Sequence, residues 1–178
     1  MREKDWDIRV LQRLRDLYER EEKWSALVEL LKDEFEHIPA EESSKDARIK
    51  KLMEIVNLYR GPLNLGAMAL TTLQRILEIE PAHRESLELL AATYAGEERW
   101  DGLLSVYSRM MDRARDEGDE DTEVDLLRKT AALWVDSLGN PQRALEPLRR
   151  LRELSPDDRE ARALMAKIYE MRRDWRSL

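Results

Sequence analysis

Cysteine is absent from this sequence of 178 residues, which excludes disulfides, a thiol nucleophile and any metal site with cysteine ligands. Glycine and proline number six each and phenylalanine occurs once, so the turns and aromatic runs of a β-sheet protein are scarce. No apolar run approaches the roughly 18 residues that a membrane-spanning helix requires, and the first residues contain no apolar signal-peptide core. These absences predict a cytoplasmic protein that makes no contact with a membrane.

Positive charge is in deficit as well. Lysine and arginine total 31 against 38 aspartate and glutamate residues, a formal net charge of −7 with histidine neutral. Because proteins that bind nucleic acid usually carry a basic surface, this balance argues against a nucleic-acid partner. Charged residues still make up 39% of the chain and hydrophobic residues 42%, and leucine, alanine, glutamate and arginine dominate these groups. These four residue types favour helices, so the composition predicts an all-α fold.

An internal repeat is the most informative feature of the sequence. Residues 52–103 align without gaps on residues 127–178, an offset of 75, and 16 of the 52 aligned positions are identical. Chance identity for common residues is on the order of one in fifteen, so the match is well above background. The amino-terminal segment joins the repeat at an offset of 76, where Tyr18 matches Tyr94. The chain is therefore built from repeated blocks of about 75 residues.

Each block divides again into two helix pairs. An aromatic residue recurs at the end of the first helix of every pair, and these residues are Tyr18, Tyr59, Tyr94, Trp134 and Tyr169. Apolar residues follow the i, i+3, i+4, i+7 spacing of a helix with one buried face. With the proline and glycine stops, the pattern predicts helices near residues 6–21, 24–37, 43–60, 63–79, 83–96, 100–116, 120–137, 141–154 and 158–172. Pro147 falls inside one of them, which predicts a kink or a later helix start.

The stretch 138–158 resembles the tetratricopeptide repeat family. It carries the family's turn glycine at Gly139, the small residue at Ala144 and the closing proline at Pro156. The resemblance covers essentially the whole chain, and the paired form is similar to long arrays in large bacterial proteins. It implies one right-handed α-solenoid of antiparallel helix pairs over residues 1–178, with units near 6–39, 43–81, 83–117, 120–156 and an incomplete 158–178. Arg15 occupies the small-residue slot of the first unit, where we expect looser packing.

The sequence offers little for catalysis. His37 and His83 stand apart from any ligand cluster, no glycine-rich phosphate loop is present, and no Ser/His/Asp set follows from spacing. We therefore expect a protein that is not an enzyme and holds no catalytic residue, metal or cofactor. Trp134 replaces a tyrosine in the repeat and is interpreted as a packing residue.

The resemblance implies a binding surface on the concave side, which the first helix of each pair lines in this family. The candidate groove residues are Arg9, Arg13, Lys50, Asn57, Arg60, Glu88, Leu89, Arg128, Lys129 and Lys167. Some chaperone-binding members grip a terminal carboxylate with lysine and asparagine, and Lys50 and Asn57 occupy comparable slots. Glu85 and Glu88 would repel an acidic tail at the next unit. The leading hypothesis is a scaffold that binds a protein or peptide partner in this groove.

Two other hypotheses stay open. The chain is alternatively a structural spacer or oligomerisation segment of a larger repeat protein. RNA binding, as in a related helical-repeat family that reads one base per repeat, is disfavoured by the net charge. Residues 175–178 match residues 100–103, where a helix continues, so we expect a fragment of a longer array. An array interrupted there is expected either to self-associate through its carboxyl-terminal end or to have a frayed last helix.

Overall fold

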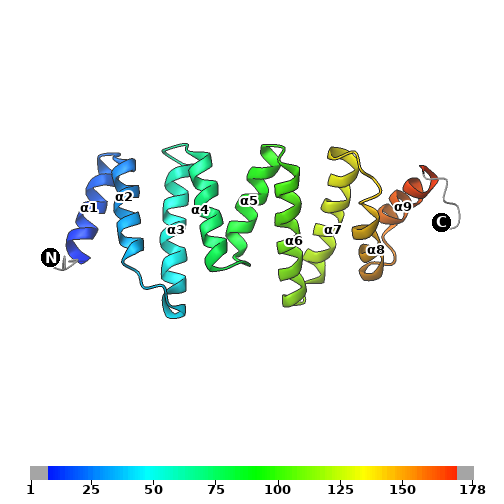
Figure 1. Ribbon diagram of the computed structural model, residues 1–178, viewed down its shortest axis with the longest axis horizontal. Helices are drawn as coiled ribbons and strands as arrows, with labels where there is room; N and C mark the ends of the chain where they lie inside the picture. Colours follow the sequence, from blue (N-terminus) through cyan, green and yellow to red (C-terminus); the bar gives the residue numbers. More distant parts are fainter. Residues whose placement is uncertain (1–7, 172–178) are drawn as a thin grey trace. The chain divides into compact units, whose positions relative to one another are not determined.

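The computed structural model describes residues 8–171, and within this range the chain forms nine α-helices and no strand (Figure 1). The prediction of an all-α fold is confirmed for this part of the chain. The backbone divides into two compact units, and the division falls between Pro81 and Ala82. None of the helices within residues 8–171 is both long and apolar enough to cross a membrane.

The first unit contains four α-helices. They are α1 (Ile8–Arg20), α2 (Trp24–Glu36), α3 (Lys45–Arg60) and α4 (Gly66–Ile79), with a 3-10 turn, η1 (Glu42–Ser44), before α3. Each helix packs against its neighbour in the chain, α1 on α2, α2 on α3 and α3 on α4. The core is formed by their apolar faces, and its most deeply buried large side chains are Leu52, Ile55, Val56, Leu73 and Ile76.

The second unit contains five α-helices packed in the same sequential way. They are α5 (Arg84–Gly96), α6 (Trp100–Glu117), α7 (Glu120–Ala132), α8 (Leu145–Leu154) and α9 (Arg159–Met171), and a π-helical turn, η2 (Leu133–Ser137), extends α7. Leu87, Leu90, Leu148, Leu151 and Ile168 are the largest fully buried residues here. In both units, contacts between consecutive helices match the local packing expected of helical repeats.

The observed helices lie close to the predicted ones. The helix expected at 141–154 begins at Leu145, so Pro147 falls in its first turn, where a missing N–H removes no helical hydrogen bond. The helix expected at 120–137 is an α-helix only to Ala132 and continues as the π-helical turn. The expected helix start at residue 6 and the interrupted helix at residues 175–178 lie outside the described residues.

The turns within the two units repeat their hydrogen bonds. The N–H of Leu65 donates to the carbonyl of Tyr59 at 2.7 Å, and 75 residues later the N–H of Asn140 donates to the carbonyl of Trp134 at 2.8 Å. The sequence repeat is therefore also a repeat of backbone conformation at the turn that follows α3 and η2.

The earlier turn of each block repeats too. Glu22 and Glu98 both adopt left-handed backbone conformations, with φ of 54° and 56°. In each case the next residue's N–H donates at 2.8 Å to the carbonyl of the closing tyrosine, Tyr18 or Tyr94. This is the pattern of a Schellman helix end, with glutamate where glycine is usual.

Candidate functional site

The candidate groove residues from the sequence are on the surface of the structure. Arg9, Arg13, Lys50, Asn57 and Arg60 belong to α1 and α3 of the first unit, and Glu88, Leu89, Arg128, Lys129 and Lys167 belong to α5, α7 and α9 of the second. All are exposed except Leu89, which is half-buried. That these residues form one groove across both units stays a prediction.

Two of the candidate cations have partners within the second unit. Arg128 pairs with Asp158 at 2.8 Å, and Lys129 pairs with Asp125 at 2.6 Å. Asp158 accepts a hydrogen bond from the N–H of Ala161 at 2.9 Å, and so caps α9. This N–H and the Arg128 guanidinium outweigh burial and lower the pKa of Asp158. The charge of Arg128 therefore helps to hold the start of α9.

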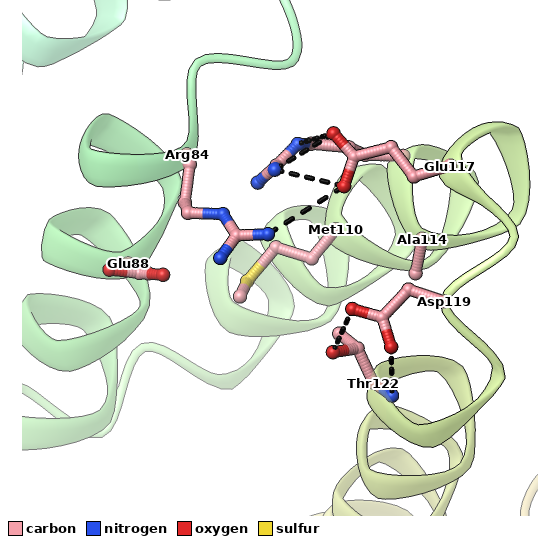
Figure 2. A pocket seen from close by; sticks show the side chains of 8 residues that line it. Arg84, Glu88, Met110, Ala114, Glu117, Asp119 and Thr122 are labelled. Carbon is pink, nitrogen blue, oxygen red and sulfur yellow. Dashed lines mark hydrogen bonds and ion pairs between the residues drawn. The ribbon is translucent and has the colours of Figure 1, made fainter.

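Glu88 lines a small pocket between α5, α6 and the start of α7 (Figure 2). Its volume is about 70 Å³, which holds a few water molecules rather than a ligand. Glu117 accepts two hydrogen bonds from Arg113, at 2.9 and 3.0 Å, and lies 3.6 Å from Arg84. These charges hold α6 to α5.

Asp119, at the other side of that pocket, is the cap of α7. Its carboxylate accepts from the N–H of Thr122 at 3.0 Å and from the Thr122 hydroxyl at 2.6 Å. The hydroxyl and then the N–H lower the pKa of Asp119. Figure 2 shows this pair set apart from the arginine–glutamate group. The polar groups of the pocket thus stabilise helix ends, which gives the pocket a structural role.

A much larger hollow, which we name the α6–α8 groove, runs between α6 and α8 over α7. Its volume is about 820 Å³, within the roughly 300–1,000 Å³ of ligand sites. The lining residues are Leu104, Ser108, Met111, Arg115, Leu127, Thr130, Trp134, Arg143, Glu146, Pro147 and Arg150. None of the candidate residues from the sequence is among them. By helical periodicity, Leu127 and Thr130 lie on the opposite side of α7 from Arg128 and Lys129.

A buried carboxylate supports one wall of the α6–α8 groove. The Glu123 side chain is 3% exposed and accepts from Nε of Arg115 at 2.7 Å and from Nε of Arg150 at 3.1 Å. Burial raises the pKa of Glu123, but the hydrogen bonds from Arg150 and Arg115 outweigh burial and the pKa is lowered. Glu123 is therefore ionised at neutral pH and ties α6, α7 and α8 together.

The floor of the same groove is aromatic and carries one unpaired polar group. Trp134 is half-buried, and the guanidinium of the exposed Arg143 lies 5.0 Å from its ring centroid. Thr130 is 8% exposed, and its hydroxyl has no hydrogen-bond partner among the described residues. Burying an unsatisfied hydroxyl is unfavourable, so this feature is unusual for a purely structural surface.

The first unit has a counterpart, which we name the α2–α4 groove, with a volume of about 350 Å³. It is lined by Lys32, Phe35, Leu52, Ile55, Tyr59, Met68, Thr71, Thr72, Gln74, Arg75 and Glu78. Seven of these residues match lining residues of the α6–α8 groove at the offset of 75. The two grooves are therefore the same place in two copies of the repeat.

The α2–α4 groove is narrowed by a ring from its own unit. Phe35 is 2% exposed and contacts two guanidiniums, with Arg48 at 4.9 Å and Arg75 at 4.3 Å from the ring centroid. Arg75 also pairs with the neighbouring Glu36 at 3.0 Å. Two cation–π contacts to one ring stabilise this arrangement.

Arg15 is accommodated by an ion-pair cluster. Its guanidinium pairs with Glu34 on α2 and, at 3.4 Å, with Glu54 on α3. Lys51 completes the cluster at 2.8 Å from Glu34, and burial lowers the pKa of this lysine. A large charged residue thus replaces the expected small one at no loss of partners, because α2 and α3 supply two carboxylates.

The α6–α8 groove lies outside the surface expected from the sequence, although two residues of the repeat point to it: Trp134 at a tyrosine position and Arg143 at the position of Met68. No protein-family model matches the chain, and neither does any curated protein sequence.

Within residues 8–171 no group of three histidine, aspartate or glutamate side chains could hold a metal ion. His83 instead caps α5, where its ring accepts from the N–H of Ser86 at 3.3 Å.

Proposed function

We propose that this chain is a protein-binding scaffold of the tetratricopeptide type, which holds a segment of another protein on its surface. The observation that carries the proposal is the α6–α8 groove, an open hollow with an aromatic floor and three arginines on its rim. Tryptophan and arginine are the residue types most enriched at the energetic centres of protein interfaces. The repeated turns and the sequential helix packing support the family resemblance.

The chemistry of the groove favours binding over catalysis. Its described lining residues include no histidine or lysine, and an arginine guanidinium is too basic to exchange protons near neutral pH. Ser108 is on α6 and Glu146 is on α8, and no hydrogen bond joins these two side chains among the described residues. A nucleophile activated by a nearby base is thus not assembled in this part of the chain.

Site-specific crosslinking tests the proposal. A photoreactive benzoylphenylalanine at Ser108 in the groove should crosslink another protein in cell extract, and the same group at the adjacent, outward-facing Arg109 should not. Arg143→Glu should abolish the crosslink. If neither position crosslinks, the groove is not a binding surface, and the structural-spacer hypothesis is favoured.

A second set of variants tests the surface expected from the family. Reversing Arg13, Lys50 and Arg60 to glutamate leaves the α6–α8 groove unchanged, because all three residues belong to the first unit. Loss of the crosslinked partner in this triple variant alone would move the binding surface to α1 and α3.

A further inference from the structure

The α2–α4 groove shows how this place in the repeat is occupied when a ring is available. The ring belongs to Phe35, within the acidic run Asp33-Glu34-Phe35-Glu36. Arg75 contacts the Phe35 ring, with 4.3 Å to its centroid, and pairs at 3.0 Å with the carboxylate of Glu36, the residue after Phe35. An aromatic side chain flanked by carboxylates is therefore complementary to arginines at this position.

The second unit has no such ring. Met111 stands where the first unit has Phe35, at the offset of 76, and is only half-buried. The groove beside it is about 820 Å³, against about 350 Å³ in the first unit. The extra space is large enough for an incoming aromatic side chain, and the Trp134 floor offers it an aromatic surface to pack on.

The charges of the α6–α8 groove favour an acidic occupant. Arg115 and Arg150 share the buried carboxylate of Glu123 and also pair at 3.2 Å with Asp112 and Glu153, respectively. No ion pair joins Arg143 to a carboxylate among the described residues, so its charge is the one available to a ligand. Arg143 is exposed, and its guanidinium lies over the Trp134 ring, 5.0 Å from the centroid, where a ligand in the groove can reach it. Arginine held in this way binds carboxylates with two parallel hydrogen bonds.

We infer that the α6–α8 groove binds a segment of a partner protein in which an aromatic side chain is flanked by carboxylates. The aromatic side chain enters beside Met111 and Trp134, and a flanking carboxylate pairs with Arg143. This inference rests on the proposed function and specifies its partner.

The inference is tested on the full chain with labelled peptides of defined sequence. The probe is acetyl-Glu-Glu-Phe-Glu-Leu-amide, and its matched controls replace the phenylalanine with alanine or every glutamate with lysine. Fluorescence anisotropy should show binding that is roughly tenfold to a hundredfold weaker for the alanine control. The lysine control should not bind, and added salt should lower the affinity of the acidic peptide.

Nuclear magnetic resonance of the tryptophan indole N–H groups shows where on the protein the peptide binds. The acidic peptide should shift the indole signal of Trp134, assigned with Trp134→Phe, and leave that of Trp24 in place. Arg143→Glu should weaken binding roughly tenfold or more. Arg149→Glu is the matched control, because this exposed arginine makes the same charge change on α8 outside the groove and should leave affinity unchanged.

The outcomes separate this inference from the proposed function. Equal binding of acidic, alanine and lysine peptides, or an equal effect of Arg143→Glu and Arg149→Glu, overturns the inference. If a crosslinked partner is found at Ser108 but the acidic peptide fails to compete with it, the scaffold function stands and the acidic-aromatic specificity is wrong. If no crosslink forms and no peptide binds, both the proposed function and this inference are wrong.

Discussion

The two grooves occupy the same place in the repeat and use opposite chemistry. In the first unit, Arg48 and Arg75 both make cation–π contacts with the Phe35 ring. In the second, Arg150 occupies the position of Arg75, but Glu123 replaces Arg48, so a carboxylate takes the place of the ring as the partner of the guanidinium. One arginine position thus accepts either an aromatic ring or a carboxylate, because guanidinium binds both.

The difference decides which groove is open. A phenylalanine ring fills the space between three helices and leaves a hollow of about 350 Å³. A carboxylate needs little room and is held at the side by Arg115 and Arg150, so about 820 Å³ remains. The first unit uses this position for its core, and the second leaves it available for a ligand.

The largest effect should come from removing the ring. Phe35→Ala should reduce the free energy of unfolding by about 3–5 kcal/mol, because it creates a cavity and leaves Arg48 and Arg75 without their partner. Met111→Ala in the second unit should cost clearly less, since Met111 is already half-exposed to the groove. Urea unfolding of the two variants measures the contrast, and equal losses would show that both grooves are filled alike.

Neutralising the buried carboxylate should have the next largest effect. Glu123→Gln should lower the free energy of unfolding by about 1–3 kcal/mol, because the buried acceptor of two charged guanidiniums loses its negative charge. Glu146→Gln is the control, as this glutamate is exposed at the same groove. Thermal melts in which both variants match the wild type would remove Glu123 as a structural element.

Introducing an aromatic ring into the second unit, at the position of Phe35 in the first, tests whether the missing ring is what opens the α6–α8 groove. The variant Met111→Phe should place a ring in the α6–α8 groove and narrow it, while Glu123 keeps its ion pairs with Arg115 and Arg150. The expected result is a fold that melts close to the wild-type temperature with roughly tenfold or greater loss of acidic-peptide affinity. Full retention of peptide binding would show that the ring's absence is not what opens the groove.

The smallest expected effect is a difference in acid sensitivity. The pKa of Glu123, Asp119 and Asp158 is lowered, and all three residues belong to the second unit. A carboxylate whose pKa is lower in the folded state contributes stability above its unfolded pKa, near 4, and loses it as pH falls through the folded pKa. Hydrogen exchange between pH 6 and pH 3 should therefore lose protection in α7 before α3, and simultaneous loss would contradict this assignment.

The sequence by itself determined the helices and their repeat. Apolar spacing, proline and glycine stops and capping residues act over a few neighbouring positions, which is why each expected helix within residues 8–171 appears close to its expected place. Even the later start at Leu145 follows from Pro147, because proline is compatible with only the first turn of a helix.

Tertiary structure alone decided which repeat copy has an open groove. The periodicity of α3 and α7 places Ile55 and Thr130 at the same position, but only packing shows that the Thr130 hydroxyl lacks a partner. Arg75 and Arg150 occupy the same position of the repeat. Their partners come from other helices, Phe35 in one unit and Glu123 in the other. The partner of a side chain depends on which residue the neighbouring helix places opposite it. That residue is distant in the sequence, so the sequence around the side chain does not predict the contact.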